Sequence, residues 1–114
     1  MKQGEIWLID LNPTVGAEMN KTRPAVIVND DQLGRLPLKI IAPITDWKEH
    51  YRIAPWMIAL NPSNQNGLTK KSSIDCFQIR SVSKNRLIKQ IGFITFQEML
   101  KVQEGIVKII GYEY

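Results

Sequence analysis

The chain has 114 residues, of which 44% are hydrophobic and 23% are charged, as is typical of a soluble globular protein. No apolar segment approaches the roughly 20 residues that span a membrane, and the N-terminus lacks a signal-peptide core. These features argue against a membrane or secreted protein and predict a cytoplasmic one without a membrane partner. The length suits one domain with one core, covering residues 1–114.

The chain contains a single cysteine, Cys76, which excludes an internal disulfide and a pair of cysteine metal ligands. It follows Asp75 in a strand-like segment, whereas reactive thiols need electropositive, partly exposed surroundings. We therefore interpret Cys76 as a buried, unreactive thiol, and we predict no metal or cofactor.

Positive charge is concentrated in the second half of the chain. The formal net charge is +4, yet residues 1–60 hold seven Lys/Arg and seven Asp/Glu. Residues 70–89 hold six bases and one acid, which gives a local charge of +5. Such a segment is expected where a protein binds RNA or DNA, although lysines that keep edge strands apart give the same pattern.

Apolar, β-branched segments predict six strands separated by turn-forming residues. The predicted strands are Gly4–Leu11, Ala25–Val28, Leu38–Ile44, Pro55–Leu60, Ser72–Val82 and Leu87–Ile94. We expect Ser72–Val82 to be bent or bulged. The loop Thr14–Thr22 is longer than a hairpin needs, which is typical of a functional loop.

One segment near the C-terminus has a helical period. Thr95 and Glu98 fit a capping box, and Gly111 is placed to end the helix. The apolar stripe comprises Phe96, Met99, Leu100, Ile106, Val107 and Ile110. Short strands with one terminal helix predict a mainly β fold, a small barrel with the C-terminal helix packed on it.

Two of the predicted strands carry a polar residue at one end. Arg23 precedes Ala25–Val28, and Thr45 follows Leu38–Ile44. If these strands pair antiparallel, the start of one lies beside the end of the other. We therefore expect Arg23 and Thr45 to share one rim of the sheet.

The segment after Thr45 mixes aromatic and basic side chains. Trp47 lies beside Lys48, with Arg52 close behind, a pattern that suits single-stranded RNA because aromatics stack on bases and cations contact phosphates. The single histidine, His50, lies in the same segment without a second histidine nearby, so a surface or base-stacking role is favoured over catalysis. We expect Trp56 to belong to the core.

Several short motifs occur in order along nearly the whole chain. They are Asp10–Glu18, Thr22–Val28, Ala42–Thr45, Gly67–Ser73, Phe77–Val82 and Ile91–Ile94. Together these motifs resemble those of the MazF/PemK toxin family.

The resemblance implies the toxin of a type II toxin–antitoxin system, a sequence-specific endoribonuclease that cleaves single-stranded mRNA without a metal. It implies transesterification to 2′,3′-cyclic phosphate and 5′-hydroxyl ends, which inhibits translation and growth. It further implies an SH3-like barrel of about six to seven strands, a homodimer, and a cognate antitoxin, which we expect to be acidic and partly disordered.

The resemblance also implies a set of site residues. The family's catalytic arginine and threonine fall on Arg23 and Thr45, its loop glutamate falls on Glu18, and Gln78 matches a position associated with RNA binding. The aromatic and basic patterns complete the RNA-binding candidates, which are Gln78, Trp47, Lys48, Arg52, Lys70, Lys71 and Arg80.

This chemistry is consistent with the residue types. RNA carries its own nucleophile, the 2′-hydroxyl, so cleavage needs in-line geometry and charge stabilisation. The guanidinium of Arg23 can donate to two phosphate oxygens, and the Thr45 hydroxyl can donate to one. Because arginine stays protonated in proteins, we favour charge stabilisation over proton transfer for Arg23, while leaving the latter open. Glu18 either assists Arg23 or is a solvated loop acid.

One alternative function remains open, a barrel that binds nucleic acid or protein without catalysis, as a topoisomerase inhibitor would. A pure binder would not need Arg23 and Thr45 together. Two stretches depart from the family pattern, Asp46 and Lys70–Ser73. An acid at position 46 would lie beside the phosphate, where we expect it to alter rate or base preference.

Overall fold

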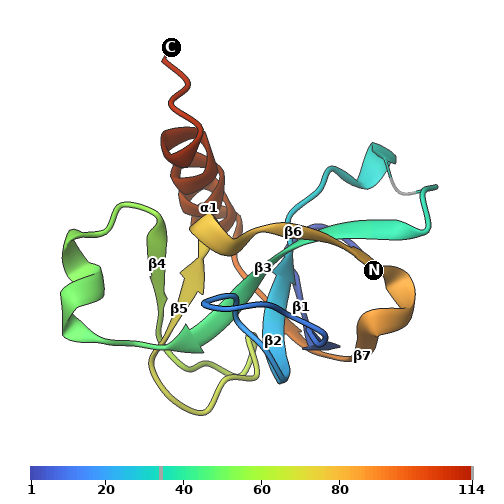
Figure 1. Ribbon diagram of the computed structural model, residues 1–114. Coiled ribbons are helices and arrows are strands. Elements are labelled where there is room, and N and C mark those ends of the chain that lie inside the picture. Colours follow the sequence, from blue (N-terminus) through green and yellow to red (C-terminus); the bar gives the residue numbers. More distant parts are fainter. Residues whose placement is uncertain (34, 114) are drawn as a thin grey trace.

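The computed structural model describes residues 1–33 and 35–113 and contains seven strands and a C-terminal helix. The strands are β1 (Glu5–Asp10), β2 (Thr22–Ile27), β3 (Leu38–Asp46), β4 (Met57–Leu60), β5 (Ser72–Asp75), β6 (Arg80–Ser83) and β7 (Leu87–Phe93). The helix α1 spans Phe96–Ile109. Figure 1 shows α1 on one side of the sheet, with the C-terminus beyond it. The predicted mainly β fold with a C-terminal helix is confirmed. The seven strands fall within the six to seven that the resemblance implies, one more than the six apolar segments predict.

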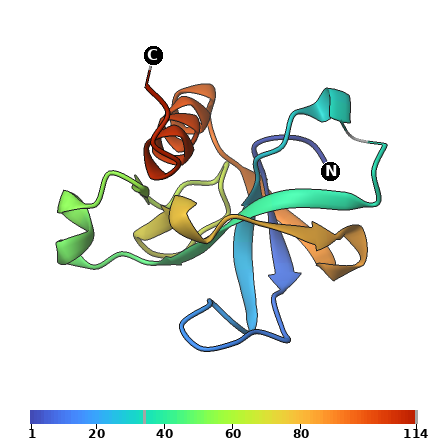
Figure 2. The same cartoon turned by 45° about the horizontal axis from the view of Figure 1, so that its top comes forward.

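The strands form one antiparallel sheet in the order β4-β5-β3-β2-β1-β7, with β6 also paired to β3. The end strands β4 and β7 do not pair with each other within the described part of the chain, so the barrel is open. The loop of residues 11–21 between β1 and β2, which we call the flap, extends from the sheet on the side away from α1 (Figure 2). The flap contains residues 14–21 of the predicted loop, and the last predicted loop residue, Thr22, begins β2.

The predicted strand Ser72–Val82 is divided in the structure. β5 pairs with residues 44–46 of β3 and β6 pairs with residues 38–41, while the 3₁₀ helix η3 (Cys76–Gln78) lies between them. The break occurs opposite Pro43, which has no N–H to donate to a strand ladder. The carboxylate of Asp75 caps η3 by accepting from the Phe77 backbone N–H at 3.0 Å.

Buried residues form two clusters. One, containing Ile6, Val26 and Ala42, packs with α1, and the other contains Ile9, Ala25 and Ile41. Val26 and Ala25, like Ala42 and Ile41, are neighbours in the chain, so the clusters lie on opposite faces of β2 and β3. The sheet is therefore covered on both faces, as its continuous apolar sequence predicts.

The capping box at the start of α1 is confirmed, with Thr95 accepting from the Glu98 backbone and Glu98 from that of Thr95. The predicted stripe was only partly right. α1 buries Met99, Val102 and Gly105, whereas Phe96, Leu100 and Ile110 are exposed. A Cβ at Gly105 would lie 3.1 Å from the Cys76 sulfur, a tight contact that would make the sulfur shift by a few tenths of an ångström. No helix among residues 1–33 and 35–113 is long and apolar enough to cross a membrane.

Candidate functional site

Arg23 and Thr45 line one cavity of about 230 Å³, which we call the rim cavity. β2 and β3 pair from Ile27 opposite Ile41 to Ala25 opposite Pro43, and Arg23 and Thr45 each lie two residues beyond that last pair, on the same side of it. The rim cavity is lined by Thr22, Arg23, Pro24, Ile44, Thr45, Asp46, Leu68, Thr69, Lys70 and Ser72. The structure thus brings together the two polar strand ends that the sequence singles out.

The flap, rather than a carboxylate, orients the Arg23 side chain. Arg23 Nε donates to the backbone carbonyl of Asn20 at 2.9 Å. Glu18 instead accepts from the Val15 backbone N–H at 2.6 Å and does not line the rim cavity. Because Nε is used by Asn20, the terminal nitrogens of Arg23 are the donors that can approach a phosphate.

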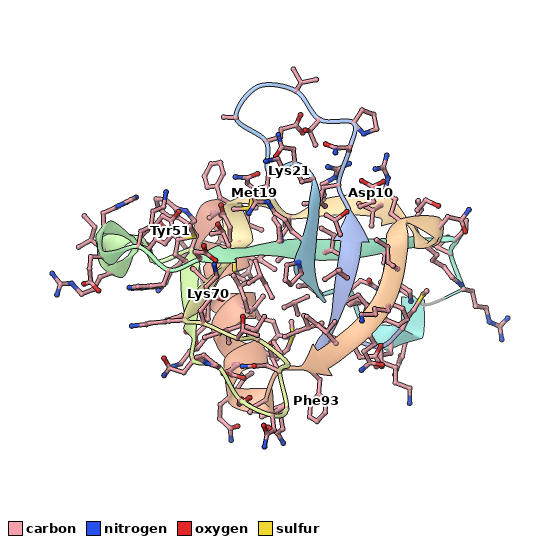
Figure 3. The ribbon with its side chains drawn as sticks, turned by 90° about the horizontal axis from the view of Figure 1, so that it is seen from below. Asp10, Met19, Lys21, Tyr51, Lys70 and Phe93 are labelled. Atoms are coloured by element: carbon pink, nitrogen blue, oxygen red, sulfur yellow. The ribbon has the colours of Figure 1, made fainter. Side chains whose placement is uncertain are left out.

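An ion pair lies at the edge of the rim cavity. Lys70 Nζ is 2.9 Å from an Asp46 carboxylate oxygen, and both side chains are about two-thirds exposed. Figure 3 shows Lys70 and Tyr51 near the same end of β3. Lys70 therefore balances the negative charge that Asp46 brings beside Thr45.

A second cavity, of about 380 Å³, lies between the flap and η3, and we call it the flap cavity. It is lined by Leu11, Ala17, Glu18, Met19, Pro43, Phe77, Gln78, Ile79 and Arg80. The cavity contains Glu18, Gln78 and Arg80, three of the candidates predicted from the sequence. Arg80 is half-buried and its Nη1 donates to the Leu11 carbonyl at 3.1 Å, so it supports the base of the flap.

The remaining candidates lie around the 3₁₀ helix η2 (Glu49–Ile53). Lys71 Nζ lies 4.7 Å from the ring centre of the half-buried Trp47, a cation–π contact, and the Tyr51 ring meets Trp47 edge-on. Lys48 and Arg52 are exposed. His50 stacks edge-on against Tyr51 on the same surface. Trp56 is half-buried against the core cluster below α1, as expected.

Sequence reasoning missed three residues that hold these candidates in place. Asn20 contacts Arg23 through its backbone, so no side-chain pattern could reveal it. Asp75 and Met19 bind the two ends of the Gln78 amide. An acid inside an apolar strand was the available signal for Asp75, since buried carboxylates are rare unless paired.

Two groups beneath the flap cavity have shifted pKa values. Burial raises the pKa of the Asp75 carboxyl, against the opposing effect of hydrogen bonds from Phe77 and Gln78. Burial, together with the neighbouring Asp75 charge, raises the pKa of the Cys76 thiol to about 12, so Cys76 is a buried neutral thiol as expected. In the described part of the chain, no group of three or more His, Cys, Asp or Glu side chains lies close enough to hold a metal ion.

Comparisons with known proteins agree with this geometry. Residues 2–110 match the model of a family described as PemK-like, MazF-like toxin of type II toxin-antitoxin system. The chain is 31% identical over 110 residues to endoribonuclease MazF9 of Mycobacterium tuberculosis, with 93% of this chain and 92% of that protein covered.

Solved structures of similar proteins share the fold. MazF of Deinococcus radiodurans superposes with a TM-score of 0.82 at 18% identity, covering 98% of this chain and 97% of that one. A mycobacterial endoribonuclease in complex with its cognate antitoxin has a TM-score of 0.77 at 19% identity, covering 100% and 98%. The chain belongs to the family of PemK-like, MazF-like toxins of type II toxin–antitoxin systems.

Proposed function

We propose that this toxin is a sequence-specific endoribonuclease that cleaves single-stranded RNA, with Arg23 and Thr45 as its catalytic residues. The observation that carries the proposal is that both side chains line the rim cavity. The names of relatives such as endoribonuclease MazF9 support it. Because the proposed substrate is mRNA, we place its action in the cytoplasm, where cleavage would stop translation and growth.

In the proposed reaction the RNA 2′-oxygen loses its proton and bonds to the adjacent phosphorus, while the bond from phosphorus to the 5′-oxygen breaks and that oxygen gains a proton. The products are a 2′,3′-cyclic phosphate and a 5′-hydroxyl, so no cofactor is needed to balance the step. The terminal nitrogens of Arg23 donate to the non-bridging oxygens as charge develops on the phosphorane, and the Thr45 hydroxyl adds one donor. The Asn20 carbonyl keeps the guanidinium pointed at that position.

Among the described residues, the acid that lines the rim cavity is Asp46, whereas Glu18 lines the flap cavity. We therefore assign Glu18 an indirect role, since it holds the flap through Val15. RNA on either side of the cleaved bond would contact Gln78 in the flap cavity and the basic and aromatic side chains around η2. These are Trp47, Lys48, Arg52, Lys70, Lys71 and Arg80.

Cleavage of a mixed-sequence RNA in EDTA, followed by mapping of the ends, tests the proposal. We expect cuts at one short sequence, with 5′ ends that accept phosphate from a kinase without prior dephosphorylation. Arg23→Ala should abolish cutting while the far-ultraviolet circular dichroism is unchanged, and the exposed Arg35→Ala is the matched control. RNA that stays intact in every sequence context and buffer would overturn the enzyme proposal and favour a binding module.

We also propose that the toxin forms a homodimer and is inhibited by an acidic, partly disordered antitoxin chain. The mycobacterial endoribonuclease that has this fold was solved with its cognate antitoxin. The net charge of +4 favours an acidic partner that competes with RNA. Sedimentation tests the first point, since a monomer at micromolar concentration would contradict it.

A further inference from the structure

The flap is held to the sheet by a chain of hydrogen bonds that ends on a buried carboxylate. The Met19 backbone N–H donates to Gln78 Oε1 at 2.6 Å, across 59 residues of sequence. Gln78 Nε2 donates in turn to Asp75 Oδ2 at 3.3 Å. Asp75 as a whole residue is only 6% exposed, and its other carboxylate oxygen caps η3. Figure 3 shows Met19 where the flap returns to the sheet.

Chemistry fixes the direction of this chain. A backbone N–H can only donate, and an ionised carboxylate can only accept, so the Gln78 amide satisfies both partners in one orientation. If the amide were flipped, its NH₂ group would face the Met19 N–H and its oxygen would face the Asp75 carboxylate. Both contacts would then be lost, and a partly buried polar group left unpaired is costly.

The segment that contains Gln78 and Arg80 contacts both ends of the flap. Arg80 Nη1 donates to the carbonyl of Leu11, where the flap leaves β1, and Gln78 contacts Met19, where the flap returns to β2. Met19 is followed directly by Asn20, whose carbonyl orients Arg23. The hydrogen-bond chain from Asp75 therefore ends one residue from the contact that positions the guanidinium.

We propose that Asp75 is a positioning residue, which fixes the orientation of the Gln78 amide and, through it, the position of the Met19 backbone in the flap. The proposal deepens the function proposed above, because Gln78 lines the flap cavity in which RNA would bind. Asp75 touches no substrate itself. Its removal should loosen the flap and weaken RNA binding more than it slows the chemical step.

The first test is hydrogen exchange of the Met19 backbone amide in the RNA-free protein. In Asp75→Asn, the single amide oxygen can accept from the Phe77 N–H or from Gln78 Nε2, but not from both. While that oxygen continues to cap η3, the new NH₂ group faces Gln78 Nε2, which leaves either a flipped Gln78 amide or two opposed donors. We expect Met19 exchange to quicken by about tenfold and KM for RNA to rise severalfold with kcat nearly unchanged. Asp30→Asn is the matched control, since Asp30 also accepts from a backbone N–H two residues ahead, that of Gln32.

A double substitution separates positioning from general damage to the fold. Gln78→Glu alone sets two carboxylates against each other and should also quicken Met19 exchange. When Asp75→Asn is combined with Gln78→Glu, the amide introduced at position 75 can donate to one oxygen of the carboxylate introduced at position 78. The other oxygen of that carboxylate then accepts from the Met19 N–H. The pair should restore slow exchange, and a double variant that exchanges as fast as the faster single one would overturn the proposal.

The readouts distinguish this proposal from the proposed function. If the wild type cuts no RNA but Met19 exchange follows the expected order, the positioning role stands and the ribonuclease does not. If RNA is cut and the Met19 amide exchanges at the same rate in Asp75→Asn as in Asp30→Asn, the positioning role is wrong. Slow exchange in Gln78→Glu alone, at a pH where both carboxyls are ionised, would also contradict it.

Discussion

The rim cavity and the flap cavity are built in different ways. Arg23 and Thr45 lie near the ends of two neighbouring strands, each two residues beyond the last β2–β3 pair, so strand pairing brings their backbones to one cavity. Gln78 stands on a single turn of 3₁₀ helix and depends on Asp75 below it and Met19 across from it. Backbone pairing thus positions the proposed catalytic pair, whereas side-chain hydrogen bonds position the proposed binding residue.

The difference teaches where each kind of substitution should act. Changes at the rim cavity remove donors that meet the charge of the transition state, and these should lower kcat. Changes at the flap cavity alter how RNA is held before it reacts, and these should raise KM. The two cavities are linked through the flap, because Met19 and Asn20 are consecutive residues.

Among the substitutions that compare the two cavities, Arg23→Lys has the largest expected effect. Lysine keeps the positive charge but offers a point charge rather than a planar fork, so it cannot donate to two phosphate oxygens in parallel. Single-turnover cleavage should slow by about 10²-fold, with Arg35→Lys as the control. A rate within about twofold of the wild type would mean that charge alone suffices and that fork geometry at the rim is unimportant.

Gln78→Ala should have a smaller effect of a different kind. The substitution removes the acceptor for Met19 and the amide that faces the flap cavity, so we expect KM to rise about tenfold while kcat changes less than about twofold. Steady-state kinetics on one short RNA measures both constants. Gln97→Ala, on the exposed face of α1, is the matched control. A fall in kcat equal to that of Arg23→Lys would contradict the proposal that the rim cavity acts on kcat and the flap cavity on KM.

The ion pair at the rim gives a smaller, salt-dependent effect. Asp46→Asn frees Lys70 to meet phosphate and removes a like charge, so RNA affinity should rise severalfold at low salt. Lys70→Ala should lower affinity and leave Asp46 without its partner. Both effects should fade as salt screens exposed charges. Fluorescence anisotropy of labelled RNA against Arg23→Ala protein, across a salt series, measures them without cleavage. Equal affinities for both variants would show that the pair does not face RNA.

Sequence patterns predicted the rim cavity better than the flap cavity. Arg23 and Thr45 flank apolar strands, and antiparallel pairing of adjacent strands is enough to bring them together. The contact of Asp75 with Met19 through Gln78 could not be predicted, because it joins residues far apart in the chain and depends on η3. That helix arises where Pro43 interrupts the ladder of β3. The buried face of α1 was predicted wrongly because apolar residues lie on more than one face of the helix. Gly105 belongs to the buried face because its lack of a side chain lets the helix lie close to Cys76.

The smallest expected effect concerns stability and pH, and it tests whether Asp75 is buried as described. A carboxyl whose pKa is raised by folding binds its proton more tightly in the folded state than in the unfolded one. Stability from this group is therefore present below the ordinary aspartate pKa of 3.8 and is lost as pH rises through the higher folded value. The free energy of unfolding of the wild type should fall across that interval relative to Asp75→Asn, which does not titrate there. Urea unfolding at several pH values measures the difference. A difference of the opposite sign would mean that hydrogen bonds from Phe77 and Gln78 outweigh burial, and that Asp75 holds the flap more strongly than we infer.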